Sequence, residues 1–182
     1  MTTNTSPDLQ KLSFQEAIAF TQQWLGQVES QAFSDEKVVA DLTSLLTSRN
    51  GVRGFFVAYL TGGSPLADQI PDTFFEAFRA TASEISEIVV KNLAMSTAMA
   101  IAHGRNNDLQ QQAGSKQVQR RSIQLLKTLL DGTDDNPFEQ ERQALITALQ
   151  TEKGKYATFH QKWGYDAEQR QAMEAALEAI AK

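Results

Sequence analysis

The sequence of 182 residues contains no cysteine and only two histidines. A chain without thiols cannot form disulfides, and it has no thiolate to act as a nucleophile or to bind zinc or an iron–sulfur cluster. The histidines belong to no His-Glu-x-x-His or Glu-x-x-His pattern, which gives metal catalysis little support. A nucleophile-elbow sequence is also missing, so a hydrolase triad has no basis. We therefore expect no metal and no cofactor, and the sequence favours a non-enzymatic role.

The sequence has fewer basic than acidic residues, with 17 Lys and Arg against 22 Asp and Glu, which gives a formal net charge of -5. Nucleic-acid binding is driven by basic surface, so we expect no nucleic-acid partner. The N-terminus has no basic segment followed by an apolar one, as a secretory signal would have. The most membrane-like segment, residues 85–102, is interrupted by Glu87, Lys91 and Asn92. We expect a cytoplasmic protein without a membrane partner.

The composition is that of a globular domain, with 41% hydrophobic and 21% charged residues. Apolar residues recur at spacings of three and four, and the alternation typical of strands is missing. These patterns predict an all-α fold, a single-domain antiparallel helical bundle of about six to eight helices. Residues 1–12 are expected to form a flexible N-terminal tail, and residues 13–182 the helical domain.

Capping residues and glycines predict where helices begin and end. Ser13, with Glu16 three residues later, forms a capping-box pattern. Asn50-Gly51 is expected to end a helix, and residues 105–114 are expected to be a linker or a helix end. Residues 71–103 form either one helix or two joined near residues 81–83. Further helix starts are predicted at Ser34, Ser115, Asn136 with Pro137, and Asp166.

Residues 51–63 are the most apolar segment, and their β-branched and aromatic side chains are strand-like. No partner strand is found elsewhere in the sequence, and a lone strand would leave its backbone groups unpaired. We therefore predict a short buried helix.

His103 lies on one helical line with Asn92 and Ser96. The three side chains could form a pocket in which His103 acts as a ligand or general base, oriented by the other two. The simpler interpretation places His103 at a helix C-terminus, where its charge suits the helix dipole. Both interpretations stay open.

Two further groups are candidate binding residues. His160 and Trp163, with Tyr156 and Phe159 nearby, could stack on a planar ligand, although such clusters are more often core or interface rim. Arg53, close to glycines before a helix, could hold a phosphate or carboxylate. The spacing around Arg53 matches neither the P-loop nor the dinucleotide fingerprint, and a solvated arginine explains it equally.

Two functional hypotheses follow. In the first, the chain is a helical interaction or regulatory protein that forms a homodimer or binds another protein, through its first helix and residues 55–60. In the second, it is a small-molecule-binding bundle with a pocket between residues 85–103 and the aromatic residues near Tyr59 and Trp163. An enzyme is a third hypothesis, and it would have to use His103 or His160.

Overall fold

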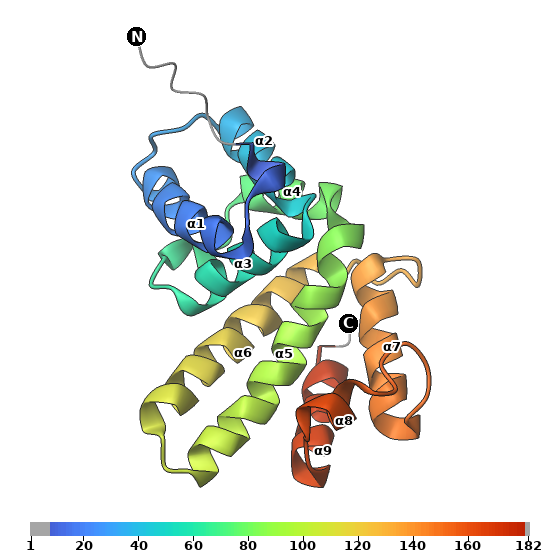
Figure 1. The fold of residues 1–182 in the computed structure, drawn as a ribbon. Helices are drawn as coiled ribbons and strands as arrows, with labels where there is room; N and C mark the ends of the chain where they lie inside the picture. Colours follow the sequence, from blue (N-terminus) through green and yellow to red (C-terminus); the bar gives the residue numbers. More distant parts are fainter. Residues whose placement is uncertain (1–7, 181–182) are drawn as a thin grey trace. The chain divides into compact units, whose positions relative to one another are not determined.

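The computed structural model describes residues 8–180, and these are almost entirely helical (Figure 1). The described residues form nine α-helices and two short 3-10 helices, with no strand among them. The predicted all-α helical bundle is therefore confirmed. The expected tail lies partly outside the described residues, and within it Leu9–Lys11 forms a 3-10 helix with Leu9 buried.

The chain divides into two compact units. Unit 1 extends to Ile85 and unit 2 begins at Ser86, so the division falls near the start of a continuous helix, α5. Unit 1 contains α1 (Phe14–Glu29), α2 (Asp35–Leu46), α3 (Arg49–Thr61), the 3-10 helix Pro65–Ala67 and α4 (Asp72–Ala80). Unit 2 contains most of α5 (Ala82–Arg105), then α6 (Leu109–Leu129), α7 (Pro137–Thr151), α8 (Phe159–Trp163) and α9 (Ala167–Glu178).

Most predicted helix starts are confirmed by their caps. The Ser13 hydroxyl accepts from the Glu16 N–H, and the Glu16 carboxylate accepts from the Ser13 N–H, which completes the capping box. The predicted break between two helices lies at Thr81, which separates α4 from α5. The other confirmed N-caps are Ser34, Asn136 and Asp166.

Two boundary predictions are wrong. Asn50-Gly51 does not end a helix. Ser48 is the N-cap of α3, its hydroxyl accepts from the Gly51 N–H, and Asn50 and Gly51 therefore lie in the first turn of α3. Ser115 does not begin a helix either. Asp108 is the N-cap of α6, and its carboxylate accepts from the Gln111 N–H. The glutamines after Asp108 are good helix formers and already belong to α6. Residues 51–63 do form the predicted buried helix, as part of α3.

Unit 1 is organised around a close crossing of α1 and α3. Gly54 of α3 lies against Ala17 of α1, where a Cβ on the glycine would be 2.5 Å from the Ala17 Cβ. Beside this contact, the rings of α1, α3 and α4 pack together, and Trp24 stacks on Phe74 at 5.5 Å. The buried rings of this core are Trp24, Phe55, Phe56, Tyr59, Phe74 and Phe78.

This core overturns one expected contact surface. Residues 55–60 were expected to meet a partner, but all of them except Val57 are buried inside unit 1. Their side chains complete the ring cluster instead. The apolar content of this segment therefore reflects the core of unit 1.

Unit 2 is built on α5, and three glutamine side chains attach other helices to it. From α6, the Gln112 amide donates to the Ala100 carbonyl at 3.2 Å, and the Gln119 amide donates to the Thr97 hydroxyl at 2.9 Å. From α9, Gln169 donates to the Ala98 carbonyl at 2.9 Å. Side chains from two neighbouring helices thus fix their register on α5.

Helix α5 is also the one described helix that is long and apolar enough to cross a membrane. Its apolar window has a mean hydropathy of 1.3, and 56% of that window is buried inside the structure. Core helices of soluble proteins meet the same criterion, so this finding is weak evidence for a membrane span.

We expect Gly54→Ala to destabilise the protein by about 2 kcal/mol, because the new methyl group has to separate α1 from α3. Gly26→Ala is the matched control, since a Cβ there would meet nothing within 4 Å. Removing a glycine from an open helical position should stabilise the protein by about 0.5–1 kcal/mol. Urea unfolding of both variants measures the difference, and equal effects would contradict a close crossing.

Candidate functional site

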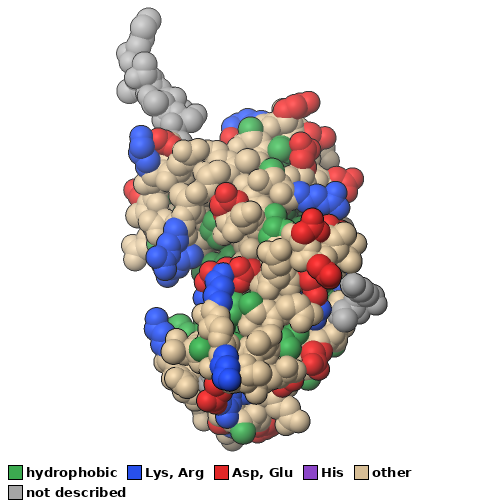
Figure 2. Space-filling model, turned by 90° about the vertical axis from the view of Figure 1, so that its right-hand side faces the viewer, with side chains coloured by type: hydrophobic (Ala, Val, Ile, Leu, Met, Phe, Trp, Pro, Cys, Tyr) green, Lys and Arg blue, Asp and Glu red, His purple; other side chains and the backbone are tan. Residues whose placement is uncertain are grey.

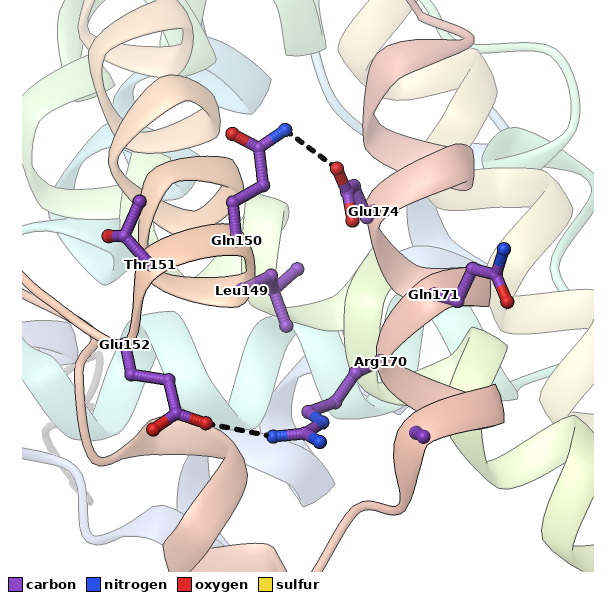
Figure 3. Close-up of a pocket in the computed structure, with 8 residues that line it drawn as sticks. Leu149, Gln150, Thr151, Glu152, Arg170, Gln171 and Glu174 are labelled. Carbon is purple, nitrogen blue, oxygen red and sulfur yellow. Dashed lines mark hydrogen bonds and ion pairs between the residues drawn. The ribbon is translucent and has the colours of Figure 1, made fainter.

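The described part of unit 2 contains a groove between the end of α7 and the first turns of α9 (Figure 3). Its volume is about 460 Å³, and most of its lining is polar. From α7 and its C-cap it is lined by Leu149, Gln150, Thr151 and Glu152, and from α9 by Ala167, Arg170, Gln171 and Glu174.

Two polar bridges cross this groove. The Gln150 amide donates to the Glu174 carboxylate at 2.6 Å, and the Arg170 guanidinium donates to the Glu152 carboxylate at 3.1 Å. Figure 3 shows the two bridges at opposite ends, with the Leu149 side chain between them. Glu152 is the C-cap of α7 and adopts the left-handed backbone conformation, with φ 58°. The groove therefore presents charged groups of both signs around an apolar side chain.

The residues around His103 are spread along α5. His103 lies in the last turn of the helix and is partly exposed, as the simpler interpretation expected. The Ser96 hydroxyl is buried and donates to the Leu93 carbonyl at 3.1 Å, so its hydrogen bond stays within its own helix. Among the described residues, no side-chain hydrogen bond joins His103 to Asn92 or Ser96. A binding role for the three residues remains a prediction.

The other predicted site residues have different surroundings. In unit 1, Tyr59 is buried in the ring cluster and donates its hydroxyl to the Leu66 carbonyl at 2.8 Å. Arg53 is exposed, with its guanidinium 4.7 Å from the centre of the Phe14 ring. In unit 2, Trp163 is 55% exposed, and the His160 side chain lies outside the described residues. The pocket expected near Tyr59 and Trp163 therefore remains a prediction.

Sequence reasoning missed a charged network in unit 2. The Lys91 ammonium group lies 5.1 Å from the Tyr156 ring centre and 5.6 Å from that of Phe159, and it pairs with Glu87 at 2.5 Å. Tyr156 donates its hydroxyl to Glu141. The helical spacing of Glu87 and Lys91 was visible in the sequence. Their contact with the segment after α7 was not, because it joins residues far apart in the chain.

This network attaches the segment between α7 and α8 to α5. Lys155, the neighbour of Tyr156, pairs with Glu141 at 2.5 Å and with Glu87 at 3.4 Å. Two effects raise the pKa of Tyr156 far above its usual value: burial is the larger, and the hydrogen bond to Glu141 is the second. The hydrogen bond from Lys91 lowers the pKa of Glu87. The phenol of Tyr156 is thus held neutral and the Glu87 carboxylate charged, an arrangement suited to anchoring a loop.

Unit 2 also exposes two large apolar side chains that lie, along the sequence, within four residues of one ion-pair cluster. Arg105 at the end of α5 pairs with Asp166, at 2.5 Å, and with Glu168 at the start of α9. Leu109, four residues after Arg105, is 72% exposed, and Trp163 lies three residues before Asp166. We call these five residues the Arg105 surface.

We expect Tyr156→Phe to reduce the loss of stability at alkaline pH. A raised pKa means that the folded state favours the neutral phenol, so this stabilisation is complete below the ordinary tyrosine pKa of 10.0 and declines as the pH rises above it. Phenylalanine keeps the ring beneath Lys91 but cannot ionise. Urea unfolding between pH 8 and pH 11, roughly the range around the free tyrosine pKa, should show a shallower decline for the variant.

Tyr165→Phe is the comparison for this experiment. Burial alone raises the pKa of Tyr165, without a carboxylate acceptor for its hydroxyl. We therefore expect a smaller change in the alkaline slope than for Tyr156→Phe. Identical slopes for wild type and Tyr156→Phe would contradict the raised pKa of Tyr156, and equal changes for the two variants would contradict the contribution assigned to Glu141.

No group of three or more His, Asp or Glu side chains in the described part of the chain could hold a metal ion. Comparisons with curated proteins and with solved structures gave no match. A family model, in contrast, matches residues 13–180. Because this match spans most of the sequence, the chain belongs to that family, which is described as "Uncharacterised conserved protein UCP020893".

Proposed function

We propose that the chain is a non-enzymatic helical interaction protein that forms a homodimer through the Arg105 surface. The observation that carries this proposal is the exposure of Leu109 and Trp163, at 72% and 55%, each within four residues along the sequence of a member of one ion-pair cluster. Covering large, water-exposed apolar side chains with a partner removes apolar surface from water, which lowers the free energy and favours association. A cytoplasmic location, and the lack of nucleic-acid and membrane partners, remain predictions from the composition.

The ion pairs are the reason for treating these residues as one surface. Arg105 connects the end of α5 with the start of α9, both at the lower end of these helices in Figure 1. Leu109 begins α6 directly after this connection, and Trp163 ends α8 just before α9. Both apolar side chains are therefore within a few residues of the same cluster.

The composition of this surface supports a protein partner. Trp and Arg are the residue types most enriched among those that dominate binding energy at interfaces, and they act as anchors surrounded by polar residues. Figure 2 shows one face of the molecule with acidic and basic side chains interspersed and hydrophobic side chains in small separate areas. Leu109 and Trp163 would be the anchors of the contact at the Arg105 surface.

A second copy of the chain is the partner that the charges favour. The Arg105 surface carries a cation and two carboxylates side by side. In a two-fold symmetric dimer the same patch meets itself, so Arg105 of each copy could pair with Asp166 or Glu168 of the other. The apolar side chains of the two copies would then meet as well. The surface is thus self-complementary in both charge and hydrophobicity.

We expect Leu109→Ala and Trp163→Ala each to weaken the dimer at least about tenfold, which corresponds to about 1.4 kcal/mol. Val57→Ala is the matched control, because Val57 is also exposed, at 41%, but lies on α3 in unit 1. Sedimentation velocity over a wide concentration range gives the dimer dissociation constant of each variant. Circular dichroism confirms that each is folded.

A wild-type chain that stays monomeric at the highest concentration would overturn the homodimer. Equal weakening by Val57→Ala would show that the contact does not depend on the Arg105 surface. A dimer that survives both substitutions in unit 2 would place the interface elsewhere.

The small-molecule-binding alternative is favoured by a different observation, the groove between α7 and α9. It lies within unit 2 and is lined by residues other than those predicted from the sequence. This alternative is independent of self-association.

A further inference from the structure

The groove between α7 and α9 contains a carboxylate without a cationic partner. Glu174 is partly buried and accepts a hydrogen bond from the neutral Gln150 amide. Among the described residues no Lys or Arg pairs with it, although Arg170 lies one turn away on the same helix face. A carboxylate has acceptor sites for several donors, so Glu174 can bind a further N–H group.

The second carboxylate of the groove comes from the opposite wall. Glu152 pairs with Arg170 at 3.1 Å, and its side chain is 56% exposed. Together the two glutamates and Arg170 give the lining a net charge of −1, from two negative groups and one positive group. The C-terminus of α7 also ends here and adds partial negative charge. The groove therefore favours a cation over an anion.

The apolar part of the lining defines the rest of the ligand. The Leu149 side chain projects between the two bridges in Figure 3, and Ala167 lies on the α9 wall. Arg170 and Glu174 are four residues apart on α9, so the two bridges are separated by roughly 6 Å along the helix. A short aliphatic chain can follow this distance with its methylene groups on Leu149 and a charged group at each end.

We propose that this groove binds a small aliphatic diamine. One ammonium group donates to the Glu174 carboxylate, and Gln150 turns its amide so that the carbonyl oxygen accepts from the same ammonium. The second ammonium donates to Glu152, which it shares with Arg170. The methylene groups between them cover Leu149. No covalent step takes place.

Calorimetric titration with putrescine, a four-carbon diamine, tests this proposal against butylamine, which has the same chain and a single ammonium group. We expect putrescine to bind at least about fivefold more tightly, because it reaches both carboxylates. Glu174→Gln and Glu152→Gln should each reduce its affinity to about that of butylamine. The buffer should contain about 0.15 M salt, so that interactions between distant surface charges are screened.

Glu178→Gln is the matched control, because it removes the same charge from α9 without changing the groove lining. We expect this variant to bind putrescine with less than a twofold change. An equal loss from all three substitutions would show attraction to the acidic surface in general and would overturn the site. Equal affinity for putrescine and butylamine would overturn the two-carboxylate geometry.

A second measurement does not depend on the variants being folded. In the wild-type protein, putrescine should shift the side-chain amide NMR signals of Gln150, which it displaces from Glu174. The amide signals of Gln112 and Gln119 on α6 serve as internal references. Both side chains donate hydrogen bonds to α5, and neither residue lines the groove. An unchanged Gln150 signal at saturating putrescine would overturn the proposal.

Discussion

The attachment of α6 and α9 to α5 is the constraint on which unit 2 depends. Ala98 and Ala100 of α5 accept hydrogen bonds from glutamines of the neighbouring helices, and Thr97 accepts a third. Small residues on α5 keep the side-chain layer thin, so the glutamine amides reach backbone carbonyls that already belong to a helix. Shifting α9 along α5 by one turn would break the Gln169 bond and leave a buried amide unpaired, at a cost of about 1–3 kcal/mol.

Both candidate surfaces follow from this register. Gln169 also completes the capping box of α9 with Asp166, so the residue that fixes α9 on α5 also fixes where α9 begins. The start of α9 then brings Asp166 to Arg105, and the same helix face places Arg170 and Glu174 opposite the end of α7. The Arg105 surface and the groove are thus two consequences of one helix position.

The sequence predicted the local structure well, because local structure depends on neighbouring residues. The capping box at Ser13 and the cap at Asp166 each involve residues three apart, and both were predicted. The wrong helix start at Ser115 has the same origin, since Asp108 is an equally good cap and the glutamines between them carry no apolar stripe. Periodicity cannot choose between two caps when the intervening turns are polar.

The candidate sites could not be predicted in this way. The groove joins Glu152 to Arg170, and the charged network joins Lys91 to Tyr156, and each pairing depends on which helices become neighbours. The predictions from the sequence instead favoured rare or aromatic residues, such as His103 and Tyr59. The Tyr59 ring is buried in the core of unit 1, and its hydroxyl donates a hydrogen bond to the Leu66 carbonyl. Glutamate and glutamine are common surface residues, so nothing in their local sequence distinguishes those that line a groove.

The positions of the two tryptophans have a spectroscopic consequence. Trp24 is 2% exposed in the core of unit 1, where its indole N–H donates to Asp41 at 3.2 Å, whereas Trp163 is 55% exposed in unit 2. Each unit therefore contains one tryptophan, and the two tryptophans differ in their contact with water. Trp24 should emit at shorter wavelength and resist soluble quenchers, and Trp163 should emit at longer wavelength and be quenched readily. On unfolding, the emission of Trp24 should change much more than that of Trp163, so the tryptophan fluorescence of the unlabelled chain reports mainly on unit 1.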